Sequence, residues 1–353
     1  MKIISRMVLA AIFLSIACIV SGQESVPDEQ VHQVVYGTAI AAGPFASWNV
    51  EDPVSVLYRE HLHRLFTWGV TENCLKMGHI RPDYDTWRFT EADNISSWFD
   101  DNGLELKGHA LVWGWQHHVP DWIGDYPVDE RPAILRDHVQ TVVTYFTGRI
   151  NVWDVVNEPV HVTGWEDALG WETIDLCEKA FRWAHEANPL AELYINDYNI
   201  LISGRDRAQY VELITELLER DVPIHGIGVQ AHMGSTLPSA AIIESALDEL
   251  AALGLPIDIT EFDMMPPQDP WSPYIGGGAE YESWFEYQAW AYRTAYETFS
   301  SHPSVKRVFM WGFTDAYHWR PGAGILDGYT VMKPAGDALL DLLITTQPEE
   351  ETE

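Results

Sequence analysis

Two carboxylates lie at the ends of strand-like runs of the sequence. The run INVWDVVNE at 150–158 is rich in Val, Ile and Trp and ends on Glu158, and PIDITEFD at 256–263 carries Glu261 near its end. A pair of carboxyl groups roughly 5 Å apart can cleave a glycosidic bond with retention, because one protonates the leaving oxygen and the other attacks the sugar carbon. The first must hold its proton near neutral pH while the second stays charged.

The backbone around each acid can be predicted from strand geometry. Side chains alternate along a strand, so we expect Asp154 to share a face with Glu158, and Ile259 a face with Glu261. Pro159 disfavours helical backbone at the residue before it, which predicts an extended Glu158. Taken alone, Glu158 fits a structural rim acid as well as a catalytic one, and Asp154 fits a buried partner that supports the fold.

Other polar and aromatic side chains fall near the ends of similar runs. Sugars present apolar faces and hydroxyl edges, so tryptophan platforms beside amide, His and Lys side chains suit a polysaccharide groove. The candidates are Glu72, Asn73 and Lys76 in VTENCLK, His109 and Trp113 in KGHALVW, Gln230 and His232 in GVQAH, and Trp311 and Trp319 in MWGFTDAYHW.

The elements that must position these residues alternate along the chain. Short apolar runs, bounded by Gly, Pro, Asn or Asp, alternate eight times with amphipathic helical patterns. This alternation predicts a single-domain (β/α)8 TIM barrel, with functional side chains at the C-terminal ends of the strands. An open doubly wound sheet is the alternative, but no Gly-rich phosphate loop follows an early strand. The expected strands are 34–41, 66–71, 105–113, 150–158, 191–199, 225–232, 256–263 and 305–315.

Seven segments, taken in order, resemble glycoside hydrolase family 10, the endo-β-1,4-xylanases. They are VTEN..LK, GHALVW, WDVVNEP, LYINDYN, GIGVQAH, ITEFD and MWGFTD....W, and they extend from Thr71 to Trp319. Each segment is weak by itself, whereas seven in family order are specific. The resemblance implies a retaining endo-β-1,4-xylanase that hydrolyses internal bonds of xylan by double displacement.

The resemblance also implies a role for each candidate residue. Glu158 would be the acid/base and Glu261 the nucleophile. Asn157 would bind the sugar 2-hydroxyl, His232 would contact the nucleophile, and Asp263 would hold His232. Sugar-binding residues would be Glu72, Asn73 and Lys76 on the glycone side, and His109, Trp113, Gln230, Trp311 and Trp319 beside the cleaved bond.

The chain departs from the family pattern at two positions. Met77 stands where the family usually has Trp, and Gly114 stands where it usually has His. Both changes leave the expected chemistry in place and bear on fine substrate preference. His117 and His118 are adjacent, but no carboxylate or Cys spacing supports a metal site, so we interpret them as loop residues and expect no metal or cofactor.

The ends of the chain predict export. Residues 1–22 have the charged start, apolar body and small residues of a signal peptide, which leaves a catalytic domain at 23–345 and an acidic disordered tail at 346–353. We therefore expect a secreted or periplasmic protein; lipidation at Cys18 is the alternative. Outside the signal only Cys74 and Cys177 remain, which we expect to be unpaired and partly buried.

The charge and apolar pattern limit the partners. The net charge is −32, which argues against nucleic acid and anionic membranes, and no later apolar run is long enough to span a membrane. We expect a monomer acting on xylan or xylo-oligosaccharides. The alternatives are another retaining barrel glycanase acting on β-glucan, or a non-catalytic polysaccharide-binding barrel; the latter predicts loss of at least one acid, and both are present.

Overall fold

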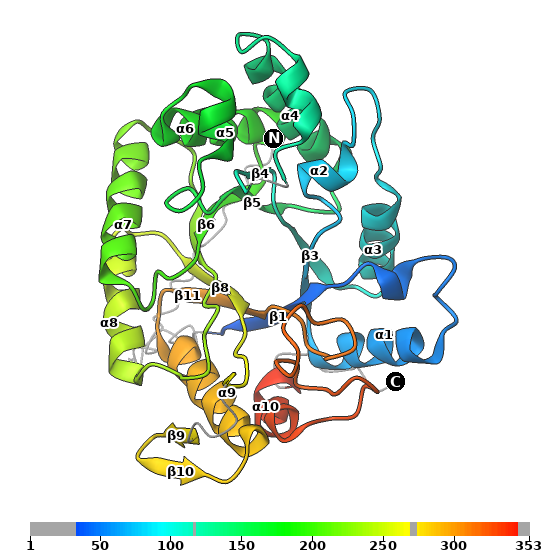
Figure 1. Cartoon of the computed structure of the whole chain (residues 1–353), viewed down its shortest axis with the longest axis vertical. Coiled ribbons are helices and arrows are strands. Elements are labelled where there is room, and N and C mark those ends of the chain that lie inside the picture. The colour runs from blue at the N-terminus through cyan, green and yellow to red at the C-terminus, as the bar shows by residue number, and fades with distance from the viewer. Residues whose placement is uncertain (1–32, 116–117, 269–273, 345–353) are drawn as a thin grey trace, which may run out of the picture. The chain divides into compact units, whose positions relative to one another are not determined.

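The computed structural model describes residues 33–115, 118–268 and 274–344. Its parallel strands close into a barrel in the order β3-β2-β1-β11-β8-β7-β6-β5-β4, and β3 and β4 both pair with β5, so they share one of eight positions (Figure 1). The predicted (β/α)8 barrel is confirmed. The barrel strands are β1 Val35–Ile40, β2 Trp68–Thr71, β3 Glu105–Gly108, β4 Val112–Trp113, β5 Val152–Asn157, β6 Glu192–Asp197, β7 Gly226–Val229, β8 Ile257–Phe262 and β11 Val305–Met310.

Helices cover the outside of this barrel, as Figure 1 shows. Local signals fix several of their ends: Asp52 caps the first turn of α1 through the amides of Val54 and Ser55, and α5 stops at Gly170, whose φ is 69°. The helices are α1 Pro53–Leu65, α2 Met77–Ile80, α3 Thr90–Asp101, α4 Arg131–Phe146, α5 Gly164–Leu169, α6 Thr173–Ala187, α7 Gly204–Glu219, α8 Ala240–Ala251, α9 Trp284–Ser301 and α10 Pro334–Ile344. Shorter elements are the 3-10 helices η1 Gly43–Phe45 and η2 Asp121–Asp125 and the hairpin β9 Tyr274–Gly276 with β10 Ala279–Tyr281.

The hydrophobic core lies between the barrel and the helices, whereas the barrel interior holds a buried ionic network. Lys107 of β3 reaches Asp154 of β5 at 2.9 Å and Asp258 of β8 at 3.4 Å, and Arg307 of β11 reaches Asp258 at 2.9 Å. Because β3 and β8 are not neighbours in the sheet, these side chains meet across the barrel. Asp154 is thus a buried residue that supports the fold, as predicted from the sequence.

Bulges in β5 and β8 overturn the predicted alternation. The pairing of β5 with β6 slips between Asp154 and Val156, and the pairing of β8 with β11 slips between Ile259 and Phe262. Each extra residue moves the following side chains to the other face. Asp154 and Asn157 therefore both point inward, and Glu261 points inward although Ile259 packs in the outer core.

The prediction of an extended Glu158 was also wrong. Its φ is 61°, in the left-handed region, and its backbone amide bonds to the carbonyl of Asn196 on β6. The chain turns there, because the amides of His161 and Val162 bond back to the Glu158 carbonyl. Pro159 excludes only the right-handed helical region, and this turn uses the left-handed one.

Some predictions fall on residues that the structure does not describe. The signal peptide at 1–22 and the tail at 346–353 lie outside the described ranges.

Cys74 and Cys177 are free and fully buried, rather than partly buried as expected, because both sit in the core between barrel and helices. In the described part of the chain, every helix is too short or too polar to cross a membrane.

Candidate active site

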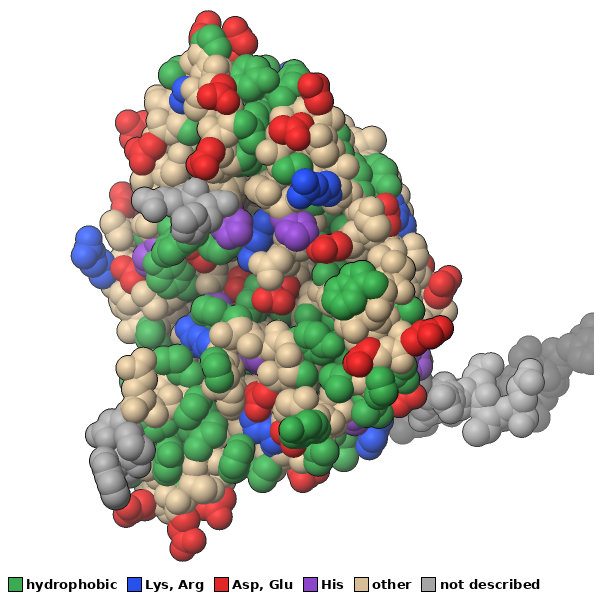
Figure 2. All heavy atoms as spheres, turned by 45° about the vertical axis from the view of Figure 1, so that its right-hand side comes forward, with side chains coloured by type: hydrophobic (Ala, Val, Ile, Leu, Met, Phe, Trp, Pro, Cys, Tyr) green, Lys and Arg blue, Asp and Glu red, His purple; other side chains and the backbone are tan. Residues whose placement is uncertain are grey.

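A hollow of about 680 Å³ opens at the C-terminal ends of the strands, and acidic, basic and His side chains gather in it (Figure 2). All the site residues expected from the sequence line this cavity except Asp263, which lies behind His232. The lining residues are Glu72, Asn73, Lys76, His109, Trp113, Trp115, His118, Asn157, Glu158, Tyr198, Asn199, Gln230, His232, Glu261, Trp311, Trp319 and Arg320.

Glu158 is buried and hydrogen-bonded on both oxygens. Trp113 Nε1 donates to its Oε2 at 2.8 Å, and Gln230 Nε2 donates to its Oε1 at 3.0 Å. Burial raises the pKa of the Glu158 carboxyl, the two donors oppose that rise, and the nearby charges of Glu261 and Asp197 add to it. The net shift is upward, which favours a carboxyl group that still holds its proton when it meets a substrate.

Glu261 is held by a neutral donor on one oxygen and a cationic donor on the other. Asn196 Nδ2 donates to Oε1 at 2.8 Å, and His232 Nε2 lies 3.1 Å from Oε2. Burial alone would lower the pKa of His232, but the charge of Asp263, 2.9 Å from Nδ1, and the hydrogen bonds to Asp263 and Glu261 raise it to about 9. His232 is therefore an imidazolium near neutral pH, and it brings a positive charge within 3.1 Å of Glu261 Oε2.

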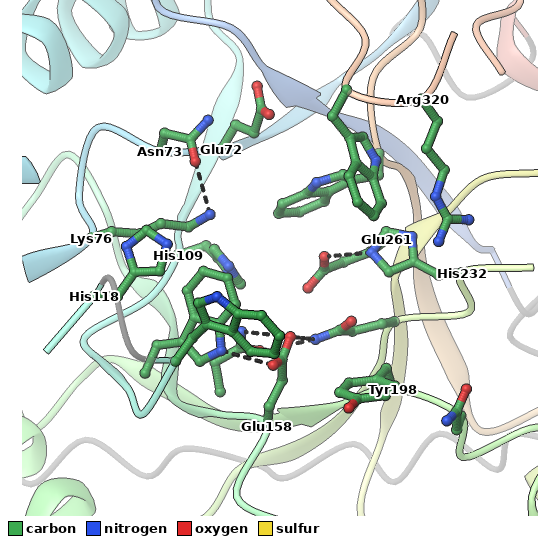
Figure 3. Close-up of a pocket in the computed structure, with 17 residues that line it drawn as sticks. Glu72, Asn73, Lys76, His109, His118, Glu158, Tyr198, His232, Glu261 and Arg320 are labelled. Carbon is green, nitrogen blue, oxygen red and sulfur yellow. Dashed lines mark hydrogen bonds and ion pairs between the residues drawn. The ribbon is translucent and has the colours of Figure 1, made fainter. Parts of the chain in front are cut away.

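Side-chain amides join the two carboxyl groups into one network. Asn157 Oδ1 accepts from Gln230 Nε2 at 3.2 Å and from Asn196 Nδ2 at 2.8 Å, and these same amides bind Glu158 and Glu261. Figure 3 shows both carboxylates pointing into the cavity. The structure thus brings together two acids more than a hundred positions apart in sequence, and places them in different electrostatic surroundings.

The expected glycone-side residues lie together at one side of the cavity. Lys76 Nζ donates to Asn73 Oδ1 at 2.9 Å and sits 4.6 Å from the centre of the Trp113 ring. Burial lowers the pKa of Lys76, with opposing contributions from Glu261 and Glu72, and burial raises the pKa of Glu72. This side therefore presents a cation, an amide and an acid to the cavity.

Asp263 fixes the opposite wall. Its Oδ2 accepts from Trp319 Nε1 at 2.8 Å, its Oδ1 accepts from Arg320 Nη1 at 2.8 Å, and Arg320 stacks over Trp319 at 4.4 Å. The same carboxylate therefore orients His232 and Trp319, a link that sequence motifs alone do not reveal. Trp311 is buried beside His109, with ring centres 5.1 Å apart.

The two departures from the family pattern have different structural settings. Met77 is buried at the start of α2 and does not line the cavity. Gly114 faces the start of α5, where a Cβ would lie 3.0 Å from the Gly164 amide nitrogen and 3.2 Å from the Val162 carbonyl oxygen. A side chain at 114 would require these backbone atoms to shift by a few tenths of an ångström.

The cavity also contains residues that the sequence reading missed. His118 is a loop residue, as interpreted, but it also lines the cavity, and its ring stacks on Trp113 with centres 4.3 Å apart; His117 lies outside the described residues. Tyr198 and Asn199 line the cavity just after β6, in the segment LYINDYN, where the strand-end rule alone would have selected them; Asn196 of the same segment is buried behind the cavity wall. Arg320 follows a predicted tryptophan but depends on loop geometry for its position.

Known proteins provide an independent comparison. The family model "Glycosyl hydrolase family 10" matches residues 29–341. The chain is 35% identical to endo-1,4-beta-xylanase B of Thermotoga neapolitana, over 89% of this chain and 88% of that protein. It is 30% identical to exoglucanase XynX of Acetivibrio thermocellus, over 90% of this chain and 30% of that protein. The crystal structure of xylanase 10B from Thermotoga petrophila RKU-1 in complex with xylobiose superposes with a TM-score of 0.77 at 31% identity, covering 89% of this chain and 95% of that one.

Proposed function

The chain belongs to glycosyl hydrolase family 10, and from that membership we propose that it is a retaining endo-β-1,4-xylanase. The observation that carries the proposal is the pair Glu158 and Glu261, which face one cavity in unlike surroundings. A raised pKa suits Glu158 to donate a proton, and a cationic neighbour suits Glu261 to attack as a carboxylate.

In the first step, the Glu158 carboxyl gives its proton to the glycosidic oxygen while Glu261 attacks the anomeric carbon. The bond to the leaving sugar breaks and a covalent glycosyl ester forms on Glu261. In the second step, the Glu158 carboxylate takes a proton from water, whose oxygen attacks the same carbon and releases Glu261. Two inversions give net retention.

The donors around the pair support both steps. Loss of its proton makes Glu158 an anion, and the hydrogen bonds from Trp113 and Gln230 stabilise that form. The Asn157 amide, fixed by Gln230 and Asn196, is placed to bind a hydroxyl of the sugar under attack. Donors held in place in this way need little reorganisation as charge develops.

Trapping of the covalent intermediate tests the mechanism. A 2-deoxy-2-fluoro xylobioside with a good leaving group slows both steps but allows the ester to accumulate. Mass spectrometry of peptides should then place one sugar adduct on Glu261. An adduct on another residue, or an inverted first product by proton NMR, would contradict the assignment.

The variant Glu261→Ala gives the matching kinetic test. Removal of the nucleophile should lower kcat on xylan by at least about 10³-fold. Binding of xylotetraose, measured by calorimetry, should remain because the sugar contacts are untouched. Turnover near that of the unmodified protein would refute the role of Glu261.

Substrate choice is tested by comparing initial rates on xylan and on soluble cellulose. The xylanase relative supports xylan, while the exoglucanase relative makes cellulose the informative competitor. We expect clear preference for xylan, and a preference for cellulose would replace the proposal with a β-glucanase.

Export and monomeric state are part of the proposal. Residues 1–22 support secretion, which N-terminal sequencing of the protein recovered outside the cytoplasm would test. A mature protein retained in the cytoplasm with residues 1–22 intact would contradict it. Sedimentation equilibrium should give the mass of a single chain.

A further inference from the structure

His161 occupies an unusual position next to the cavity. It lies in the turn that follows Glu158, and its Nδ1 is 2.6 Å from Asp197 Oδ1 at the end of β6. Its Nε2 is 3.3 Å from Asp206 Oδ2 in the first turn of α7, a contact with the geometry of an ion pair rather than of a directed hydrogen bond. The ring therefore lies between two carboxylates from different elements.

The same ring stacks on Tyr198. The centres are 3.8 Å apart and the planes differ by 22°, which is close, nearly parallel contact. The hydrogen bond to Asp197 raises the pKa of His161, burial opposes that rise, and the charges of Asp197 and Asp206 add to it. A protonated ring satisfies both carboxylates and also contacts the tyrosine face favourably.

Asp197 joins the two segments that carry these rings. It is fully buried, and besides His161 it accepts from the Val160 amide at 2.9 Å and from the Tyr198 amide at 2.8 Å. The turn after β5 and the loop after β6 are thus tied to one carboxylate. A change at His161 is therefore transmitted to Tyr198 both through the stack and through Asp197.

Tyr198 lies on the side of the cavity where the leaving sugar must sit. Figure 3 shows it beside Glu158 and across the cavity from Glu72 and Asn73. The glycosidic oxygen receives its proton from Glu158 and remains bonded to the leaving sugar, so that sugar lies on the Glu158 side. A flat aromatic ring there offers a surface for the apolar face of a sugar.

We propose that His161 is a positioning residue, which holds the Tyr198 ring and the Glu158 turn in the arrangement that receives the leaving sugar. The proposal rests on the proposed function, because it assumes that Glu158 is the acid. His161 itself does not line the cavity, so it acts through Tyr198 rather than by touching the substrate.

Two substrates separate this role from a purely structural one. Xylotetraose places sugars on both sides of the cleaved bond, whereas β-xylobiosyl fluoride has a single-atom leaving group that cannot reach Tyr198. In His161→Gln, misplacement of the leaving sugar should lower kcat/KM for xylotetraose by about ten-fold and that for the fluoride by less than about two-fold. General damage to the fold would lower both equally.

A control and a second variant complete the experiment. His302→Gln is the control. His302 is another buried histidine beside an aspartate, Asp248 at 3.4 Å, but it follows the C-terminal end of α9, away from the cavity. This change should leave the ratio of the two kcat/KM values unchanged. If His161→Gln does not fold, Asp206→Asn removes the charge of the more exposed of the two carboxylates that contact His161. It should shift the ratio of the two kcat/KM values in the same direction.

Equal losses on both substrates, or no loss on either, would overturn the role of His161. Failure of the unmodified protein to cleave either substrate would instead overturn the proposed function. The two failures are therefore distinguishable.

Discussion

Lys107 gives the sharpest test of how the barrel interior supports the site. The side chain is fully buried, and its Nζ lies 2.9 Å from Asp154 and 3.4 Å from Asp258. In Lys107→Met, Asp258 keeps its pair with Arg307 at 2.9 Å. Asp154 loses its ion pair and keeps the contact with His109, 3.0 Å away, through which it supports the cavity wall.

The expected cost follows from burial. Removing one partner of a buried ion pair leaves a charge without compensation and destabilises a protein by about 3–5 kcal/mol. Typical domains are stable by only about 5–15 kcal/mol, so this loss is a large fraction of the total. It should lower the midpoint of urea unfolding clearly, with an unchanged dependence on denaturant.

The pH dependence of this loss has a definite sign. Burial raises the pKa of Asp154, but Lys107 and His109 more than offset that effect, so the net pKa is lowered. The pair therefore contributes stability that is present above the unfolded pKa, about 3.9, and is lost as the pH falls through the lower folded value. The difference in unfolding free energy between the unmodified protein and Lys107→Met should therefore be largest above about pH 4 and shrink as the pH falls below about 4.

Lys306→Met is the matched control. Lys306 also pairs with a carboxylate at 2.9 Å, that of Glu192, but both side chains are about 40% exposed. Solvent screens such a pair, so its removal should cost less than about 1 kcal/mol. Lys107→Met should lower the free energy of unfolding by more than Lys306→Met does, and by an amount that depends on pH. If either expectation fails, the buried ionic network does not stabilise the barrel interior.

Three further predictions concern the site and its support. Trp113→Phe removes a donor that lowers the pKa of Glu158, so the alkaline limb of the kcat/KM profile should move to higher pH; a shift to lower pH would contradict the assignment of the acid. Asn196→Ala removes a hydrogen bond to the Glu261 carboxylate worth about 1.5–3 kcal/mol, so kcat/KM should fall by about ten-fold or more, and unchanged kinetics would refute the linkage. Burial of His138, with a contribution from a nearby arginine, lowers its pKa to about 3 despite an opposing backbone hydrogen bond. Because the unfolded pKa is about 6.5, the buried neutral ring contributes stability that is present above pH 6.5 and is lost as the pH falls toward 3. Calorimetric melts should show a smaller loss on acidification in His138→Gln, and an equal loss would exclude this source.

The placement of Glu158 and Glu261 could be predicted because it follows from topology. In a closed parallel barrel the C-terminal ends of all strands meet at one rim, whatever their separation in sequence. The prediction therefore needed only approximate strand ends, and it tolerated errors of several residues, such as an expected end at 315 where β11 ends at Met310. That tolerance is why the predicted residues line one cavity.

Side-chain direction could not be predicted in the same way. Alternation assigns Asn157 to the face opposite Asp154, but a bulge in β5 intervenes and Asn157 also turns inward. A bulge depends on how the partner strand pairs, and β6 begins more than thirty residues later. Within β5 the sequence INVWDVVNE carries no local signal, such as Gly, that marks the extra residue.

The distribution of basic residues shows how the fold uses an acidic composition. Among the described lysines, Lys76, Lys107 and Lys333 are buried, and each lies beside a carboxylate or an amide oxygen. Arginines differ from these lysines, because only Arg81 and Arg307 are buried among the described arginines, and acidic side chains are scattered over the surface that Figure 2 shows. Charges there repel one another without affecting the cavity directly, because a neutral sugar carries no charge to be steered. The acidic composition thus favours solubility, whereas the buried Lys76 and Lys107 contact Asn73 of the cavity and Asp154 beneath it.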